Sequence, residues 1–232
     1  MNIIITGASR GIGYDTVLEF SKNNKNQIIA ISRNISELEK LKQKCYEQYE
    51  NSIHIIEYDI TDDQAILKHK LEEYEKIDIV INNAGLLINK PFLDLSIEDW
   101  QETFNVNLFG AVKVIQTVFD KIIKSEYAHV VNIGSMGGIS VAQKFAGLSA
   151  YSSSKAALGN LTECLAEEFK DHNVSINCIC LGAVNTEMLR LAFPDCTDSF
   201  KSDDIAKFIC DFSSNYAKLF NGKIIPISSS TP

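Results

Sequence analysis

Thr6-Gly7-Ala8-Ser9-Arg10-Gly11-Ile12-Gly13 is a glycine-rich segment that joins an apolar run at residues 2–5 to a stretch with helical hydrophobic spacing at residues 11–22. Glycines allow the backbone to turn sharply, and the free N–H groups at a helix N-terminus attract phosphate. The order strand, turn and helix therefore predicts a site for a nucleotide diphosphate. The spacing is G-x-x-x-G-x-G rather than G-x-G-x-x-G, and a turn with only a structural role is the alternative.

Short β-branched runs alternate with longer helical stretches along the chain. Strands are predicted at residues 2–5, 27–31, 52–57, 77–81, 128–133, 174–179 and 223–227. Helices are predicted at residues 11–22, 34–49, 62–74, 96–124, 151–171 and 201–212. This alternation predicts an α/β fold with a doubly wound, mostly parallel seven-stranded sheet of the Rossmann type, with its ligand crevice at the carboxyl ends of the strands. No segment resembles a linker, which favours a single domain over residues 1–232.

The composition restricts the classes of partner. Thirty acidic and 22 basic side chains give the 232 residues a formal charge of −8, which argues against nucleic acid because phosphate backbones bind basic surfaces. No apolar run has the length of a membrane span, and the N-terminus does not resemble a secretory leader, so we expect a cytoplasmic protein. The six cysteines form no C-x-x-C pair, which favours reduced, buried thiols and no metal site.

Two predicted helices carry more apolar residues than a single sheet-facing side requires. Apolar residues cover most of the circumference of the second half of 96–124, and 151–171 has a second rich face. Either another helix of the same chain or a second subunit has to cover such surfaces. We expect a second subunit, and hence a homodimer or homotetramer.

Tyr151 and Lys155 are four residues apart at the start of a predicted helix, so their side chains share one face. An ordinary tyrosine has a pKa near 10 and is roughly one part in a thousand ionised at pH 7. A neighbouring ammonium favours the phenolate and lowers that pKa towards the range useful for acid–base catalysis. A surface tyrosine beside a surface lysine is the alternative interpretation.

Further polar side chains are expected near the crevice. Ser135 ends the predicted strand 128–133, although a serine that caps the turn before two glycines explains it as well. Asn82-Asn83-Ala84-Gly85 follows the predicted strand 77–81, where small residues allow a ring to approach. Asn107 lies inside an apolar helix and needs a hydrogen-bond partner, structural or catalytic.

Together, these motifs resemble the short-chain dehydrogenase/reductase family, in its short, single-domain branch. The resemblance implies that Thr6, Gly7, Gly11 and Gly13 hold the diphosphate of a dinucleotide, that Asn83, Ala84 and Gly85 border the adenosine ribose, and that Asp59 binds the adenine. It also implies a catalytic tetrad of Asn107, Ser135, Tyr151 and Lys155. The complete predicted cofactor site adds Ser9, Arg10, Ile12, Ser32, Arg33, Ile60, Gly182, Val184 and Thr186 to these residues.

The resemblance also implies the reaction, a hydride transfer between a nicotinamide cofactor and a carbonyl or alcohol. Tyr151 is expected to act as general acid or base, Ser135 to bind the substrate oxygen, and Lys155 to lower the tyrosine pKa and bind the nicotinamide ribose. Asn107 is expected to hold a water of the proton relay.

The sequence departs from the family pattern at two places. Ser135 lies 16 residues before Tyr151, a longer separation than is commonest in the family, and we assign the extra residues to the loop 139–148. Ser140 is the alternative to Ser135. Leu181-Gly182 replaces the usual Pro-Gly.

The cofactor is expected to be NADP(H). The second predicted strand ends in Ser32-Arg33, without the carboxylate that binds the ribose 2′-hydroxyl of NAD. Arg33 and Arg10 offer two cations for a 2′-phosphate.

The substrate is expected to be a small carbonyl or alcohol compound of apolar or mixed character. A lid is predicted at residues 186–200, and apolar contacts are expected from Phe145, Met188, Leu189, Leu191, Phe193 and Phe200. A 3-oxoacyl carrier-protein reductase is the alternative, for which Lys144 and Arg190 are the available basic residues. A non-catalytic NADP-binding sensor or scaffold is a third possibility.

Overall fold

The computed structural model describes residues 1–195 and 199–228. The strands are β1 (Asn2–Thr6), β2 (Gln27–Ser32), β3 (His54–Glu57), β4 (Ile79–Asn82), β5 (Ala128–Ser135), β6 (Val174–Leu181), β7 (Val184–Asn185), β8 (Phe200–Lys201) and β9 (Ile224–Ile227). The helices are α1 (Gly11–Ser21), α2 (Ile35–Tyr49), α3 (Gln64–Lys70), α4 (Ile97–Phe104), α5 (Gly110–Ile122), α6 (Ser149–Glu168), α7 (Glu187–Ala192) and α8 (Ser202–Asn215). Three short turns are η1 (Phe92–Asp94), the π-helical η2 (Asn105–Phe109) and η3 (Met136–Gly138).

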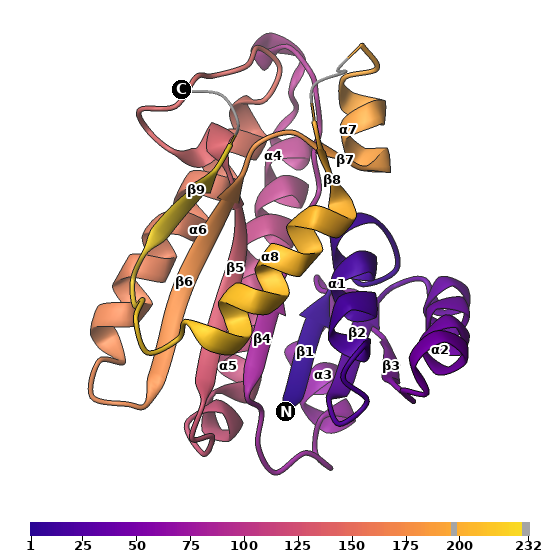
Figure 1. Cartoon of the computed structure of the whole chain (residues 1–232). Coiled ribbons are helices and arrows are strands. Elements are labelled where there is room, and N and C mark those ends of the chain that lie inside the picture. The colour runs from indigo at the N-terminus through magenta and orange to yellow at the C-terminus, as the bar shows by residue number, and fades with distance from the viewer. Residues whose placement is uncertain (196–198, 229–232) are drawn as a thin grey trace.

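Seven parallel strands form the main sheet in the order β3-β2-β1-β4-β5-β6-β9 (Figure 1). The chain first winds outward from β1 to β3 and then returns to place β4 on the other side of β1. This reversal separates the connections that follow β1 and β4, and a ligand crevice opens at such a point. The predicted doubly wound Rossmann-type sheet is confirmed.

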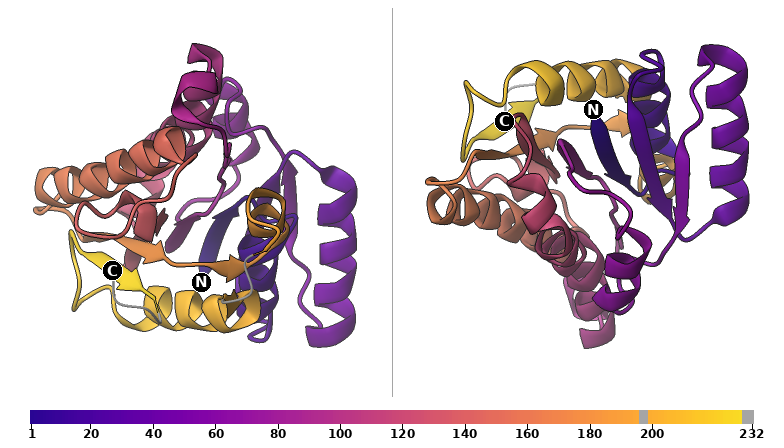
Figure 2. Two further views of the ribbon diagram at one scale, coloured as in Figure 1. Left: turned by 90° about the horizontal axis from the view of Figure 1, so that it is seen from above. Right: turned by 90° about the horizontal axis from the view of Figure 1, so that it is seen from below.

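The sheet is covered by helices on both faces (Figure 2). Residues 3 and 5 of β1 pack in one core cluster with α1, α2 and α8, whereas residue 4 packs in the other, with α3, α5 and α6. The alternation follows from the two-residue period of a strand, which sends successive side chains to opposite faces. Because both faces are covered, the strands are apolar almost throughout, as parallel sheets require.

Two predicted helices differ from those in the structure. The segment 96–124 is helical over Ile97–Ile122, but the π-helical turn η2 interrupts the α-helical hydrogen bonding between α4 and α5. A π turn contains one residue more than an α turn, and here it includes Asn107, whose side chain bonds outside the helix. The segment 62–74 forms a helix only over Gln64–Lys70, because its chain turns at the fully buried Leu71.

The structure adds two short features that hydrophobic periodicity did not predict. β7 and β8 pair as a separate two-stranded sheet, and each is too short to show a pattern. α7 begins directly after β7. In the parts of the chain that the structure describes, no helix combines the length and the apolar character needed to cross a membrane.

Candidate active site

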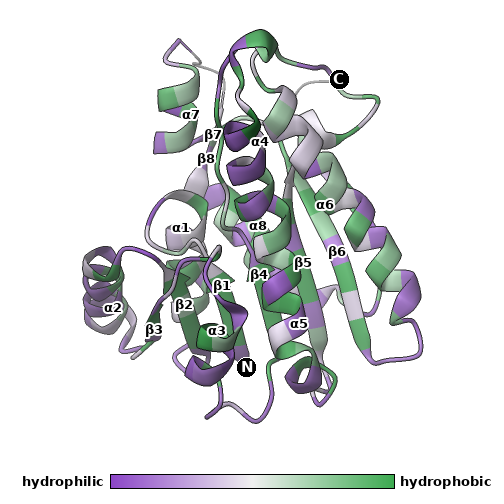
Figure 3. Cartoon of the chain, turned by 180° about the vertical axis from the view of Figure 1, so that it is seen from behind, coloured by the Kyte–Doolittle hydropathy of each residue, from purple (hydrophilic) through white to green (hydrophobic). Residues whose placement is uncertain are grey.

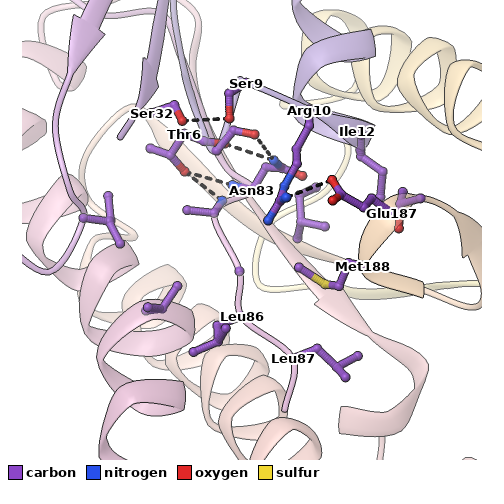
Figure 4. Close-up of a pocket in the computed structure, with 18 of the residues that line it drawn as sticks. Thr6, Ser9, Arg10, Ile12, Ser32, Asn83, Leu86, Leu87, Glu187 and Met188 are labelled. Atoms are coloured by element: carbon purple, nitrogen blue, oxygen red, sulfur yellow. Dashed lines mark hydrogen bonds and ion pairs between the residues drawn. The ribbon is translucent and has the colours of Figure 1, made fainter. Parts of the chain in front are cut away.

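A cleft of about 920 Å³ lies at the carboxyl ends of the central strands (Figure 4). Its walls include the glycine-rich turn, the ends of β2 and β5, the chain after β4, the first turns of α6 and the segment from Leu181 to Ala192. The volume lies at the upper end of the range of ligand sites. Every predicted site residue lines this cleft except Gly13 and Asn107.

The glycine-rich turn adopts backbone angles that favour glycine. Gly7 and Gly11 have φ of +66° and +56°, in the left-handed region. A Cβ on Gly7 would lie 2.8 Å from the Cα of Ala84, so the turn packs directly on the chain after β4. Gly13 serves this packing too, because a Cβ there would lie 2.4 Å from the Gly7 carbonyl oxygen. Gly13 therefore shapes the turn without facing the cleft.

Polar side chains fix the turn against the chain that follows β4. The Thr6 hydroxyl accepts hydrogen bonds from the backbone N–H groups of Asn83 and Ala84, both at 3.1 Å. The Asn83 amide donates in return to the carbonyl oxygens of Thr6 (3.0 Å) and Gly7 (3.2 Å) (Figure 4). These four bonds hold the two cleft walls in register. The first N–H groups of α1 have no partner within an α-helix and are suited to an anion.

The two arginines expected to bind a 2′-phosphate are each paired with a carboxylate. Arg10 forms an ion pair with Glu187 of α7 at 2.8 Å (Figure 4), and Arg33 forms one with Asp59 at 3.3 Å. Ser32 donates a hydrogen bond to Ser9 at 2.8 Å, and no carboxylate follows β2 directly. Both arginine side chains are mostly exposed, so a phosphate can reach them in exchange for the carboxylates.

Ser135 and Tyr151 meet inside the cleft. Ser135 ends β5, its hydroxyl accepts from the N–H of Gly137 at 3.2 Å, and it lies near the Tyr151 phenol. Burial raises the pKa of Tyr151, and the neighbouring Ser135 hydroxyl opposes that rise. Ser140, by contrast, is exposed in the loop beyond η3 and does not line the cleft.

Lys155 lies one helical turn after Tyr151 and is almost completely buried. Its ammonium donates to the carbonyl oxygen of Ile133 at 2.8 Å and lies 5.9 Å from the centre of the Tyr151 ring. Burial lowers the Lys155 pKa to about 8. The expectation that Lys155 lowers the pKa of Tyr151 is wrong for this structure, because the burial of the phenol outweighs other effects and the ammonium is directed at Ile133.

Asn107 lies behind the cleft wall and joins two of its parts. Its side-chain oxygen accepts from the N–H of Leu86 at 2.7 Å, and its amide nitrogen donates to the Leu86 carbonyl and to Ser154, both at 2.9 Å. The Ser154 hydroxyl donates to the backbone carbonyl of Tyr151 at 2.7 Å. Both amide N–H groups of Asn107 are used, so its side chain positions the chain after β4 against α6.

Several contacts at the mouth of the cleft join residues that are far apart in the sequence, and no sequence pattern predicted them. Asn89 donates to the carbonyl of Ala192 at 2.7 Å, and a Cβ on Gly147 would lie 2.0 Å from the Asn89 side-chain oxygen. Phe145 contacts Phe193, with ring centres 6.3 Å apart. Phe200, expected to line the cleft, packs instead against the core cluster that contains α1, α2 and α8.

The predicted lid at 186–200 is partly seen. It contains α7, whose first turn is capped by the Thr186 hydroxyl, and the strand β8 near its end. Residues 196–198 of this segment, including Cys196, lie outside the described residues. Of the five cysteines that the structure describes, four are buried and Cys164 is exposed, which corrects the expectation for Cys164. Within residues 1–195 and 199–228, no His, Cys, Asp and Glu side chains gather as a metal site would require.

A family model described as short chain dehydrogenase matches residues 1–196 of the chain. A 3-oxoacyl-acyl-carrier-protein reductase of Aquifex aeolicus is 27% identical over 238 residues, which cover 97% of this chain and 94% of the relative. An NADP-dependent 3-hydroxy acid dehydrogenase of Schizosaccharomyces pombe is 31% identical over 209 residues, covering 88% of this chain and 79% of the relative.

Solved structures share the whole fold. A short chain dehydrogenase of Shigella flexneri complexed with NADP aligns with a TM-score of 0.89 and 23% sequence identity. The alignment covers 97% of this chain and 95% of that chain. At this level of identity, the likeness shows the common fold.

Proposed function

Because this chain belongs to the short-chain dehydrogenase family, we propose that it is an NADP(H)-dependent oxidoreductase that interconverts a carbonyl group and an alcohol. The observation that carries this proposal is the position of Ser135 and Tyr151, side by side in the cleft with Lys155 behind them. A protein that only senses or scaffolds has no use for a buried lysine beside a cleft tyrosine, because burying such a charge costs free energy.

Tyr151 is suited to act as the general acid in carbonyl reduction. Its raised pKa keeps the phenol protonated at neutral pH, so that a proton is available for the oxygen of the substrate. Ser135 donates a hydrogen bond to the same oxygen and stabilises the negative charge that develops there. Bound NADPH supplies the hydride. Lys155 lies behind the phenol, where its ammonium can bind the nicotinamide ribose of the cofactor.

The cofactor site supports NADP(H). The two arginines Arg10 and Arg33 flank the end of β2, where an NAD-specific site needs a carboxylate and this chain has Ser32. The glycine-rich turn and the first N–H groups of α1 are suited to the diphosphate. The S. pombe relative is NADP-dependent and the S. flexneri structure contains NADP, which agrees with this assignment.

The cofactor preference is tested by comparing kcat/KM for NADPH and NADH over a panel of ketones, quinones and 3-oxoacyl thioesters. A charge-assisted hydrogen bond is worth about 1.5–3 kcal/mol, roughly 10- to 150-fold in affinity, so two arginines predict a preference for NADPH of one to three orders of magnitude. Ser32→Asp adds an acceptor for the ribose of NADH and a charge that repels the phosphate, and it should reduce the preference.

Arg33→Ala should weaken NADPH binding without affecting NADH. A wild type that prefers NADH, or a ratio that neither substitution changes, would show that the 2′-phosphate site is misplaced. Activity with neither cofactor on any member of the panel would overturn the proposed reaction.

The substrate wall of the cleft is apolar. Leu86, Leu87, Met188 and Leu189 line the cleft, and the first three are seen in Figure 4. The A. aeolicus relative acts on a substrate held by a carrier protein, whose acidic surface would need free basic residues near the mouth. Lys144 donates to the carbonyl oxygens of Gly137 and Ile139, and Arg190 donates to Asn185 at 2.6 Å. We therefore favour a free carbonyl compound over a carrier-bound one.

A further inference from the structure

Three segments surround the mouth of the cleft and contact one another. They are residues 86–97, 139–148 and 186–193, and we call them together the rim. The N–H of Lys90 donates to the carbonyl of Gly147 at 3.1 Å, and Asn89 donates to Ala192 at 2.7 Å. The rings of Phe145 and Phe193 complete the contacts. The rim is therefore one connected surface.

The rim carries an unusual share of the exposed apolar side chains. Among the described residues, 12 large hydrophobic side chains are exposed, and six of them belong to the rim. These six are Phe92, Leu93, Ile97, Val141, Phe145 and Leu191. Figure 3 shows hydrophobic stretches in the loops at the top of the molecule, where the start of α4 and α7 lie. A single exposed leucine is ordinary, but a group of apolar side chains around one opening indicates a binding surface.

The apolar surface continues from the rim into the cleft. Leu191 is 74% exposed and also lines the cleft, together with Leu87 and Leu189. Ser135 and Tyr151 line the same cleft. An apolar chain held at its carbonyl end by these two residues can therefore remain in contact with apolar side chains until it reaches the outer surface.

The basic side chains of the rim are already engaged in contacts with other residues. Lys90 forms an ion pair with Asp99 at 2.8 Å, Lys144 donates to the carbonyl oxygens of Gly137 and Ile139, and Arg190 donates to Asn185. Every lysine and arginine in the described rim thus already has a partner. Asp94 lies in the same rim, and Glu102 lines the cleft below it. A carboxylate, a phosphate or an acidic carrier would have to displace these contacts to reach the basic side chains, whereas an uncharged apolar chain would not.

We propose that the rim binds the extended, uncharged apolar tail of a substrate whose carbonyl group reaches Ser135 and Tyr151. The inference rests on the proposed function and adds to it the class of substrate, a carbonyl compound with a long hydrocarbon chain that is free and not esterified to an acidic carrier. Leu93 and Leu191 are 91% and 74% exposed. Contact with the tail would therefore remove apolar surface from water at these two side chains.

A homologous series of 2-alkanones, from 2-butanone to 2-undecanone, tests the proposal through kcat/KM with saturating NADPH. Burial of one methylene favours binding by up to about fourfold, so kcat/KM should rise by two- to fourfold per carbon over several carbons. Leu191→Ser and Leu93→Ser should reduce this increase, with a loss that grows with chain length. Leu219→Ser is the matched control, because Leu219 is 73% exposed near the opposite end of β6 and should leave the series unchanged.

Binding of 2-undecanone, followed by calorimetry, separates this inference from the proposed reaction. Turnover of all ketones with no dependence on chain length would overturn the rim as a tail site and leave the reaction intact. Tight binding of 2-undecanone that both rim variants weaken, without turnover of any ketone, would support the rim and overturn the reaction. A change of oligomeric state in Leu93→Ser, measured by light scattering, would show that the rim contacts a second copy of the chain and would overturn the proposal.

Discussion

The hydroxyl that meets the Tyr151 phenol belongs to a residue whose place is fixed by the sheet. Ser135 is the last residue of β5 and lies in register with Leu181 at the end of β6. Ser140 follows two glycines and η3, where no strand holds it. A hydrogen bond that must stabilise a transient charge needs a donor with a fixed position, and a strand end provides one.

Ser135→Ala is therefore expected to lower kcat by about 10² or more, the size of effect seen when one such donor is removed. Ser140→Ala is the matched control and should retain normal turnover. Steady-state kinetics with the same ketone and NADPH measure both variants. The reverse order of effects would mean that Ser140 is the catalytic hydroxyl and that the extra residues lie before it.

Side-chain spacing predicted part of the residue-scale picture. The separation of four residues between Tyr151 and Lys155 was sufficient to place them on one helix face, because the helix period is fixed. The direction in which the pKa of Tyr151 shifts was not predictable in the same way. It depends on how deeply the phenol is buried and on where the Lys155 ammonium points, and both are set by the packing of β5 against α6.

At the scale of the elements, a buried histidine of β5 contacts α8. His129 is fully buried, its Nδ1 lies 3.1 Å from the carbonyl oxygen of Ser213, and its Nε2 lies 3.0 Å from the Asn177 amide nitrogen. These partners suit a neutral ring that donates from Nδ1 and accepts at Nε2. Burial lowers the His129 pKa from 6.5 to about 4, against a smaller opposite effect of the Ser213 carbonyl.

This histidine should make the protein less stable in mild acid. Below pH 6.5 the unfolded chain binds a proton at His129 and the folded chain does not, so the free energy of unfolding falls as the pH drops towards 4. The contribution amounts to about 2–3 kcal/mol at pH 4.5. Urea unfolding at pH 7.5 and 4.5 measures it. His129→Gln should show a smaller loss than the wild type, and His69→Gln, at an exposed site, should not differ from the wild type.

Equal pH dependence in the wild type and in His129→Gln would contradict this account of β5.

The π-helical turn between α4 and α5 shows a further limit of hydrophobic spacing at this scale. Hydrophobic spacing predicted that residues 96–124 are helical, but one extra residue in a turn changes the spacing too little to be seen. Asn107 was a signal, since an amide inside an apolar helix needs a partner elsewhere.

For the whole molecule, the alternation of apolar runs was sufficient to predict the parallel sheet and the position of its crevice. The rim was not predictable, because its three segments are far apart in the sequence and meet only through contacts such as Asn89 with Ala192. The pairing of Arg10 with Glu187 was missed for the same reason.

The subunit arrangement remains a prediction at this scale. Other helices of the chain cover much of the excess apolar surface, since α3 packs on α5 and α4 packs on α6. Phe109, at the end of η2, stays 49% exposed. We expect a homodimer or homotetramer that buries this residue and the outer face of α6. Light scattering at micromolar concentration should give a multiple of the 25.8 kDa chain mass, and Phe109→Ser should lower it. A monomer mass for the wild type would contradict the expectation.

The fate of the transferred hydrogen tests the central claim most directly. The wild type is incubated with a ketone that it turns over and with NADPH deuterated at C4, on either face in separate reactions, and the alcohol is analysed by mass spectrometry. We predict that one of the two labelled forms delivers deuterium to the carbinol carbon, and that Tyr151→Phe does so at least ~10²-fold more slowly while it still binds NADPH. An alcohol without deuterium from either form, or a Tyr151→Phe variant as fast as the wild type, would contradict the account.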